Sequence, residues 1–287
     1  MKKVLLWLRI VRPQTLFASL IPVLVGLAAT RYQGLATTAS KPVVTAVLTA
    51  VCALSLQILS NLVNDYYDFV RGCDKAGRKG FRRALAEGEV TPRQMLAACG
   101  TALGVALLTG FCLVLEGGWV ILAIGVSAIL FAWLYTATSH SLSYLGIADI
   151  FVFLYYGVVA SCGTAYLQAH QFSSAAFYAG AVCGLISMCV LMINNLRDIE
   201  SDREVGKRTL PVRFGKGNAE IIMLAEVLLM PVFAFLAFGL SPAVLVGAAS
   251  LVLFAAVRRA EGAAYNKCLL ATGLVNVLYF ILCLISV

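Results

Sequence analysis

The sequence predicts an all-α membrane protein, and its composition and the arrangement of its apolar residues carry that prediction. Of the 287 residues, 61% are hydrophobic and 13% are charged, and the mean hydropathy is +0.91. Soluble domains have about 45–50% apolar and about 25% charged residues. The apolar residues lie in long segments, and a helix that crosses a bilayer needs about 20 of them. The alternating pattern of a membrane β-barrel is absent, so helices are the predicted spanning elements.

Nine segments are long and apolar enough to cross a membrane. We predict spans at 15–33, 43–64, 94–115, 118–136, 147–168, 172–195, 220–239, 242–257 and 268–286. Two long polar loops, at about 69–93 and 197–219, interrupt an otherwise tightly connected chain. We therefore expect a single membrane-embedded domain over residues 1–287.

The positive charges predict how this bundle is oriented. Twenty of the 22 Lys and Arg precede the first span or follow the second, sixth and eighth, and only Arg31 and Lys41 fall on the other side. Excess Lys and Arg mark the cytoplasmic side. We expect a protein of the cytoplasmic membrane, with its N-terminus and both polar loops inside and its C-terminus outside. This topology, with anionic lipid, explains the net charge of +8 without nucleic acid. Arg9 and Arg12 interrupt the first apolar stretch, so no cleavable signal peptide is expected.

Two polar stretches end the second and sixth predicted spans. They read "SNLVNDYYDFVRGCDKAGRKG" (60–80) and "MINNLRDIESDREVGKRTL" (192–210), four spans apart and in the same orientation. This weak repeat fits two four-helix halves related by an axis along the membrane normal, with a ninth helix appended. Such halves place a shared site between them.

The spacing within the second stretch predicts a stripe of oxygen ligands. Residues four apart share one face of a helix, and Asn194, Asp198 and Asp202 follow that spacing. An acidic residue at a helix end is often merely solvated or paired with a nearby Arg. Polar groups within a membrane span are costly, however, and are usually functional.

The first stretch carries two similar pairs. Asn64 and Asp68 form one pair at a spacing of four, and Asn61 and Asp65 form another, offset around the helix. Asp74 follows beyond Gly72, where we expect the helix to have ended.

Carboxylates and amides without His or thiolate are the ligand set of a hard cation. Mg²⁺ prefers oxygen ligands and commonly binds one or two carboxylates plus substrate phosphates. The candidate oxygen ligands are the two Asn–Asp pairs of the first stretch with Asp74, and Asn194, Asp198 and Asp202 of the second stretch. Two such sites facing each other would hold a diphosphate between them.

Cations in the two loops complete this hypothesis. Arg gives planar, bidentate contact to phosphate oxygens and Lys acts as a point charge. The candidate diphosphate-binding cations are Lys75, Arg78, Arg83, Lys207 and Arg213. Alternatively, each of these residues is present only because cytoplasmic loops are rich in Lys and Arg.

Several of these segments resemble one family. "NDYYDFVRGCD" and "NNLRDIESDREVGKRTL" are similar to the two Asp-rich motifs of the UbiA superfamily of membrane prenyltransferases, and "RPQTL" (12–16) resembles its N-terminal motif. "RKGFRRALAEGEVTPRQM" and "YLGIADIFVFLYYGVVASCGTAYLQ" resemble the branch that prenylates 1,4-dihydroxy-2-naphthoate in menaquinone synthesis. The resemblance runs from about residue 12 to residue 217.

The resemblance implies a nine-span bundle and a Mg²⁺-dependent reaction between a polyprenyl diphosphate and an aromatic acceptor. It assigns Asn64, Asp68 and Asp74 to the first metal site and Asn194, Asp198 and Asp202 to the second, whereas relatives do not always keep Asp65 acidic. Of these ligands, Asn64, Asp68, Asp198 and Asp202 are the predicted catalytic residues. In this reaction the allylic C–O bond ionises and an electron-rich ring carbon takes the prenyl group. In the naphthoate branch the ring carboxyl then leaves as CO₂.

The chain departs from the family in the loop after the fourth span. The family often has a Lys a few residues after a Tyr there. This chain keeps Tyr135, a candidate diphosphate ligand, but only His140 could be basic, and an unperturbed His is mostly uncharged at neutral pH. Nearby aromatic residues are candidates for lining the prenyl tail and stabilising a cation: Phe131, Trp133, Tyr135, Phe153, Tyr155 and Tyr156.

Two other functions stay open at this point. A transporter also has many spans and internal repeats, but its site lies near the membrane midplane, whereas these motifs lie at the cytoplasmic ends. Another superfamily enzyme would act on 4-hydroxybenzoate, homogentisate, haem or a chlorophyll precursor, and the sequence separates these acceptors less well.

Overall fold

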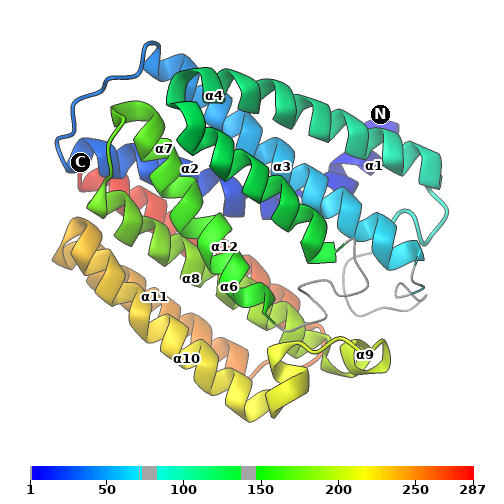
Figure 1. The fold of residues 1–287 in the computed structure, drawn as a ribbon. Helices are drawn as coiled ribbons and strands as arrows, with labels where there is room; N and C mark the ends of the chain where they lie inside the picture. The colour runs from blue at the N-terminus through cyan, green and yellow to red at the C-terminus, as the bar shows by residue number, and fades with distance from the viewer. Residues whose placement is uncertain (1, 71, 73–82, 137–146) are drawn as a thin grey trace.

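The protein is a bundle of long helices (Figure 1). The computed structural model describes residues 2–70, 72, 83–136 and 147–287, and the regular structure in that part of the chain is helical throughout. The elements are α1 (Lys2–Val11), α2 (Pro13–Tyr32), α3 (Pro42–Val70), α4 (Pro92–Thr136), α6 (Ala148–Phe153), the π-helix η1 (Leu154–Val159), α7 (Ala160–Ala169), α8 (Ser174–Arg197), α9 (Ile199–Glu204), α10 (Leu210–Phe238), α11 (Leu240–Arg258) and α12 (Ala264–Ile285). The predicted all-α class is confirmed.

The number of spans differs from the prediction in one place. Eight helices of the described part are long and apolar enough to cross a membrane. The predicted spans 94–115 and 118–136 both fall within α4, whose backbone leaves helical geometry at Gly118 (φ 61°, ψ −149°). A positive φ is accessible to glycine at little cost, and Figure 1 shows the chain turning back at this point. The described part of the chain therefore has eight candidate spans, and the predicted count of nine is not confirmed.

Large apolar side chains cover the outside of the bundle. Leu115 on α4 is 73% exposed, Val252 on α11 is 71% exposed and Leu274 on α12 is 70% exposed. A helix bundle that exposes large apolar side chains all around its outer surface is stable only where lipid surrounds it in place of water. The chain is thus an integral membrane protein.

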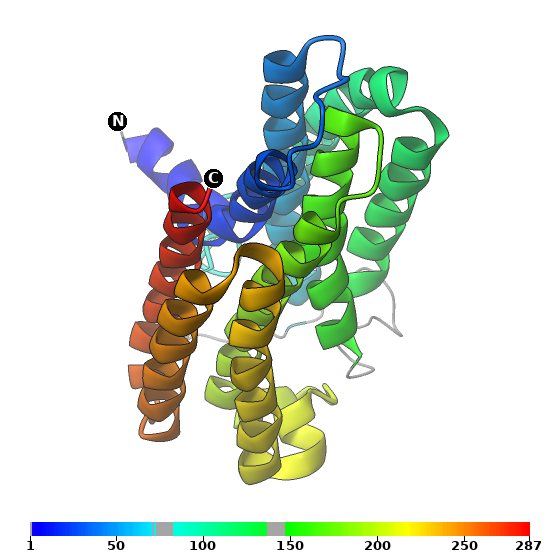
Figure 2. The same ribbon diagram turned by 90° about the vertical axis from the view of Figure 1, so that its left-hand side faces the viewer.

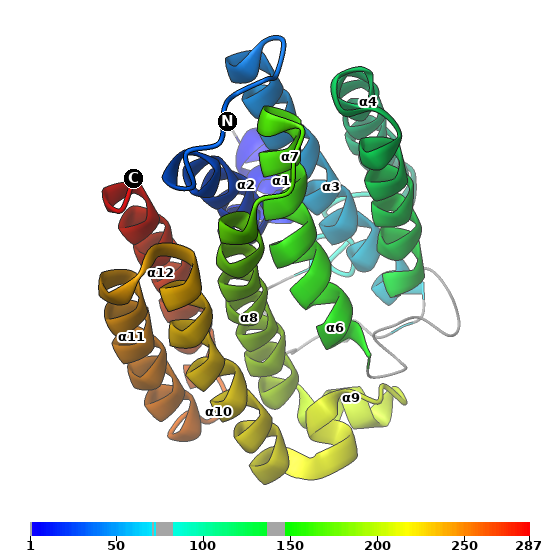
Figure 3. The same ribbon diagram turned by 60° about the vertical axis from the view of Figure 1, so that its left-hand side comes forward.

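α8 is the centre of the larger hydrophobic core. It is the most buried of the long helices, and it packs against α2, α10 and α12. Ile186, Met192 and Ile193 of α8 are buried there with Met223 of α10 and Tyr279 of α12. Figure 3 shows α8 between α6–α7 and α10, and Figure 2 shows α10, α11 and α12 side by side. The last helix also contacts α2, and it thereby closes the bundle.

A second, smaller core lies on the other side of the molecule. Leu59 and Leu62 of α3 are buried there with Ile10 of α1 and Met95 of α4. Between the two cores runs the segment α6–η1–α7, which contacts α2, α3, α4 and α8. The functional cavity described below lies along this segment.

Glycines bring the π-helix against α8. A Cβ added to Gly157 of η1 would lie 2.4 Å from the carbonyl oxygen of Gly180 and 2.5 Å from the amide nitrogen of Gly184. Small residues allow such close backbone approach between membrane helices. This contact fixes the position of the two tyrosines that precede Gly157, Tyr155 and Tyr156.

Candidate active site

The two polar stretches lie at the same end of the bundle. The end of α3 and the short helix α9 both lie at one end of the bundle, and the C-terminus lies at the other (Figures 1 and 3). Asn64 of α3 and Asn194 of α8 line one cavity of about 850 Å³. The sequence predicted that the two stretches face each other, and both contribute amides to this cavity: Asn61 and Asn64 from the first stretch and Asn194 from the second.

Two arginines surround the carboxylates at the end of α3. Asp65 is 3% exposed and accepts hydrogen bonds from Arg12 and Arg83. Asp68 is also buried, and its Oδ2 lies 3.8 Å from Nη2 of Arg83. Arg83, predicted to bind diphosphate, therefore neutralises two buried carboxylates. Asp65 was considered a weaker candidate ligand than Asp68, but its bonds to Arg12 and Arg83 connect α3 to the N-terminus of α2 and to the first polar loop.

Asn61 has a structural role in the same region. Its Nδ2 donates to the carbonyl oxygen of Val11 at 3.0 Å and to Oγ1 of Thr15 at 2.8 Å. These bonds hold the start of α2 against α3, on the side of α3 that carries Asp65.

The second stretch is bent where the sequence predicted one continuous stripe. α8 ends at Arg197, Asp198 has φ −104° and ψ 12°, and a new short helix, α9, carries Asp202. The spacing is retained, because the amide of Asp198 donates to the Asn194 carbonyl and the amide of Asp202 donates to the Asp198 carbonyl. Ser201 Oγ also donates to the Asp198 carbonyl at 2.9 Å, and this side-chain bond competes with the regular helical pattern.

Arg197 holds the carboxylate of Asp198 in a fixed orientation. Its Nε and Nη2 donate to the two carboxylate oxygens at 2.8 and 2.7 Å, and its Nη1 donates to Oδ1 of Asn266 on α12 at 2.8 Å. Only 4% of the Arg197 side chain is exposed. A bidentate pair of this kind fixes geometry as well as charge.

The two remaining described cations differ in position. Lys207 Nζ lies 3.8 Å from Oδ1 of Asp202, so the structure places it at the second stretch as predicted. Arg213 is exposed, and its guanidinium lies over the ring of Phe214, 5.2 Å from the centroid. The structure gives Arg213 a place at the edge of this region, on the first turns of α10.

Other predicted residues lie outside the described part of the chain. These are Asp74, Lys75, Arg78 and His140, together with the side chains of Trp133 and Tyr135.

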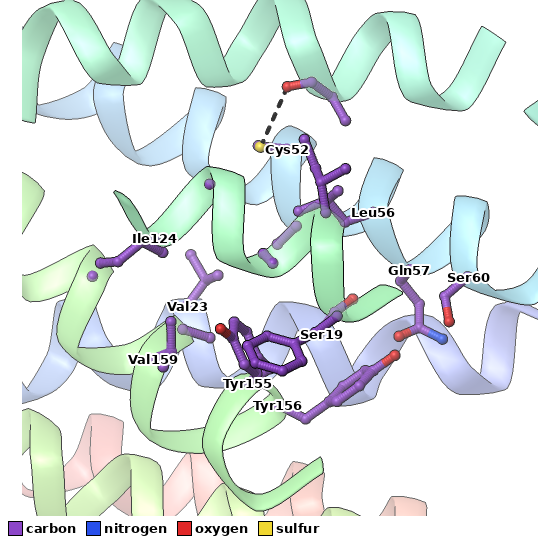
Figure 4. Close-up of a pocket in the computed structure, with 18 of the residues that line it drawn as sticks. Ser19, Val23, Cys52, Leu56, Gln57, Ser60, Ile124, Tyr155, Tyr156 and Val159 are labelled. Carbon is purple, nitrogen blue, oxygen red and sulfur yellow. Dashed lines mark hydrogen bonds between the residues drawn. The ribbon is translucent and has the colours of Figure 1, made fainter. Parts of the chain in front are cut away.

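The cavity combines a polar end with a long apolar interior. Its apolar wall includes Leu122, Val126 and Ile129 of α4. Three of the aromatic residues predicted to line the prenyl tail also line this cavity: Phe131, Tyr155 and Tyr156 (Figure 4). The ring centroids of Phe131 and Tyr155 are 5.0 Å apart. Such a cavity has room for a long apolar chain whose polar head stays at the amide end.

One aromatic prediction was wrong. Phe153 packs against the larger core and lies beside Gly184 of α8. Phe151, which was not among the predicted residues, lines the cavity and packs against Phe131 in a tilted arrangement, with ring centroids 4.5 Å apart. The residues that face the cavity cannot be read from a 3.6-residue period here, because the helix changes to a π-helix at Leu154.

The donor set at the polar end fits a hard divalent cation. Carboxylates of Asp68, Asp198 and Asp202 and amides of Asn64 and Asn194 are oxygen donors of the kind that Mg²⁺ prefers. In the described residues no three His, Cys, Asp or Glu side chains converge into a ready-made cluster. Mg²⁺ commonly binds few carboxylates and completes its coordination with water and substrate phosphate. An ionised carboxylate has about four acceptor sites, so the two bonds from Arg197 do not exhaust Asp198.

Three residues that organise this site were not predicted as site residues. Arg12 was assigned to the N-terminal motif and to the topology, Arg197 was assigned to the topology alone, and Asn266 was not considered. The adjacency of Arg197 and Asp198 was a usable signal, whereas the contributions of Arg12 and Asn266 depend on tertiary packing alone.

Arg197 should act as a positioning residue. We expect Arg197→Ala to lower kcat about 10–100-fold, the usual effect of losing an outer partner of a metal ligand, with little change in KM for the acceptor. Arg197→Lys should recover only part of the loss, because Lys lacks the planar fork. Arg203→Ala is the matched control, since Arg203 is exposed and pairs with exposed Glu200. Steady-state kinetics of the three variants check this, and equal losses in Arg197→Ala and Arg203→Ala would contradict it.

Comparison with known proteins shows the family to which the sequence is similar. The sequence profile described as "UbiA prenyltransferase family" matches residues 19–284. The chain is 40% identical over 219 residues to a 1,4-dihydroxy-2-naphthoate octaprenyltransferase of Escherichia coli, covering 74% of this chain and 70% of that protein. It is 34% identical over 260 residues to the protein of the same name from Mycobacterium tuberculosis, covering 89% and 87%.

A solved structure shows the same fold. A UbiA homolog from Archaeoglobus fulgidus, bound to GPP and Mg²⁺, superposes with a TM-score of 0.70 at 19% identity and 98% coverage of both chains.

Proposed function

Because this chain belongs to the UbiA prenyltransferase family, we propose that it transfers a polyprenyl group from a polyprenyl diphosphate to 1,4-dihydroxy-2-naphthoate. The ring carboxyl leaves as CO₂, and the product enters menaquinone synthesis. The acceptor is taken from the relatives in E. coli and M. tuberculosis, whose names state it.

The shape and polarity of the cavity carry this proposal. It starts at the amides of Asn64 and Asn194, next to buried Asp68 and Asp198, and continues between apolar side chains of α3, α4 and η1. A polyprenyl diphosphate has the same division into one charged head and one long apolar tail. A transporter site near the membrane midplane would not place its polar residues at one end of the bundle.

The polar end would hold the diphosphate through Mg²⁺. Asn64, Asp68, Asn194, Asp198 and Asp202 would bind the metal, which when bound neutralises the leaving group and acts on it as a Lewis acid. Asp74 is proposed as a further ligand from its motif alone.

Protein cations would add to this charge. Arg83 and Lys207 already face the carboxylates of the two stretches, at 3.8 Å from Asp68 and Asp202 respectively. They are in place to contact diphosphate oxygens that enter between the stretches. Lys75, Arg78, Arg213 and Tyr135 are proposed from the sequence to contact the diphosphate as well.

The apolar interior protects the reaction from water. The allylic C–O bond breaks with its electron pair leaving on the diphosphate, and water would convert the allylic cation to an alcohol. The aromatic face of Phe131 lies where it can stabilise positive charge. The ring carbon of the acceptor then supplies the electron pair of the new C–C bond.

We place the protein in the cytoplasmic membrane as one domain over residues 1–287. The distribution of Lys and Arg supports a cytoplasmic N-terminus and polar loops and a C-terminus outside. The diphosphate would then reach the site from the cytoplasm, and the prenyl tail would lie within the bilayer.

A panel of acceptors tests the proposal. Purified protein is incubated with Mg²⁺, labelled geranylgeranyl diphosphate and, in separate reactions, 1,4-dihydroxy-2-naphthoate, 4-hydroxybenzoate or homogentisate. We expect a prenylated product and CO₂ release with the naphthoate. Product only with another acceptor would overturn the acceptor assignment, and no product with any acceptor would overturn the proposed activity.

A further inference from the structure

A polar stripe continues from the diphosphate end into the cavity. Asn64, Ser60 and Gln57 follow one another at spacings of four and three residues on α3, so they lie on one face of the helix. All three line the cavity. At about 1.5 Å of rise per residue, Ser60 lies about 6 Å and Gln57 about 10 Å deeper than Asn64 along the axis. Polar side chains at this depth are not required for binding a diphosphate.

The amide of Gln57 is held in one orientation. Its Nε2 donates to Oδ1 of Asn61 at 3.2 Å, and Asn61 is fixed in turn by its bonds to Val11 and Thr15. Gln57 is 7% exposed, and its Oε1 accepts no hydrogen bond of good geometry from the described residues. A buried acceptor that lacks a hydrogen bond of good geometry is unfavourable, so Gln57 Oε1 can accept a hydrogen bond from a hydroxyl group of a ligand that enters the cavity.

Tyr156 brings a hydroxyl to the same place from the opposite wall. It lies on the π-helix, and its hydroxyl is within interaction distance of the side chains of Gln57 and Ser60 (Figure 4). π-Helical turns occur often at functional sites. The neighbouring Tyr155 has its hydroxyl directed away from Gln57 and packs its ring near Phe131 (Figure 4).

The two sides of the cavity therefore differ in chemistry. The stripe on α3 and Tyr156 offer hydroxyl and amide groups, whereas α4 offers Leu122, Val126 and Ile129. A prenyl chain has no polar atom beyond its diphosphate and fits only the second side. An aromatic acceptor with ring hydroxyl and carboxyl groups fits the first.

We propose that Gln57, Ser60 and Tyr156 form the subsite that hydrogen-bonds a ring hydroxyl or carboxyl of the aromatic acceptor. A ligand hydroxyl would donate to Gln57 Oε1, and the Tyr156 hydroxyl would donate to a ligand oxygen. This proposal rests on the proposed function and adds to it the residues that recognise the acceptor. Their place one to two turns deeper than Asn64 puts the ring beside the first carbons of the prenyl group.

The test separates acceptor recognition from diphosphate binding. Tyr156→Phe removes one hydroxyl and keeps the ring, and we expect it to raise KM for 1,4-dihydroxy-2-naphthoate about tenfold, the effect of one lost hydrogen bond. KM for geranylgeranyl diphosphate should stay within about twofold. Tyr155→Phe is the matched control, because it removes a hydroxyl from the adjacent residue of the same π-helix. Ser60→Ala should move KM in the direction of Tyr156→Phe and provides a second variant if that protein does not fold.

An acceptor analogue makes the same comparison from the ligand side. 1-Hydroxy-2-naphthoate lacks one ring hydroxyl, and the parent protein should bind or use it less well than the dihydroxy compound. That preference should shrink in Tyr156→Phe and persist in Tyr155→Phe. Similar losses in both tyrosine variants, or a rise in KM for both substrates, would overturn the subsite.

Equilibrium binding distinguishes failure of the subsite from failure of the proposed function. The naphthoate is titrated against each protein without diphosphate, with quenching of intrinsic fluorescence as the readout. Weaker binding to Tyr156→Phe than to Tyr155→Phe supports the subsite even if the parent transfers no prenyl group. Normal transfer by the parent together with equal binding to both variants would reject the subsite and leave the proposed function intact.

Discussion

Asp198→Asn and Asp68→Asn should each lower kcat by at least about a hundredfold. Loss of an outer partner of a metal ligand costs about 10–100-fold, and loss of a ligand itself should exceed the upper end of that range. Asparagine keeps the shape and removes only the charge, so the apolar packing of α3 and α8 should survive. Turnover of labelled geranylgeranyl diphosphate with a saturating acceptor gives the measurement.

Glu200→Gln is the control for this pair. Glu200 lies on α9 between Asp198 and Asp202, but its side chain is 78% exposed and pairs only loosely with Arg203, at 3.4 Å. The variant should keep near-normal turnover. Thermal unfolding in detergent shows whether each variant is folded, which matters because Asp198→Asn leaves the buried Arg197 without its carboxylate. A folded Asp198→Asn or Asp68→Asn protein with turnover within threefold of the parent would remove that residue from the proposed site.

Complete removal of divalent metal should reduce prenyl transfer to the limit of detection. The proposed ligands are carboxylates and amides, and the protein cations near them already neutralise carboxylates of the chain itself. They are therefore insufficient to neutralise a diphosphate leaving group as well. Turnover is measured after exhaustive chelation and after titration with Mg²⁺.

The identity of the metal that restores activity provides the control. Mn²⁺ accepts the same oxygen ligands and should restore turnover, whereas Zn²⁺ prefers nitrogen and sulfur ligands and should restore little. Retention of full activity in chelated protein would contradict the metal-dependent mechanism. Restoration by Zn²⁺ alone would contradict the all-oxygen ligand set.

The long-range arrangement of the site was accessible from sequence because the period of a helix is regular. Asn64 and Asn194 each lie near the end of an apolar run with a carboxylate four residues later, and the structure gives both amides to one cavity. The same regularity located the break in α4, since the gap predicted between residues 115 and 118 adjoins Gly118. These features depend on local composition and on the thickness of a bilayer.

Features set by tertiary contact were not accessible. The π-helix at Leu154–Val159 has no marker in its sequence, and it changes which aromatic side chains face the cavity. Asp65 was ranked low because relatives do not always keep it acidic. Its partners Arg12 and Arg83 lie 53 positions before it and 18 positions after it in the chain. A pattern within one helix cannot report partners of this kind.

The contact of Gly157 with α8 restricts how this cavity can change during evolution or engineering. A side chain cannot be introduced at Gly157, Gly180 or Gly184 unless the neighbouring backbone moves, because an added Cβ would lie 2.9 Å or less from a neighbouring atom at each position. On the opposite wall, Leu122 and Val126 are each about half exposed toward lipid, so a change of size there displaces lipid and not protein. A library that seeks shorter or longer isoprenoid products should therefore vary α4 and leave the glycine contact untouched.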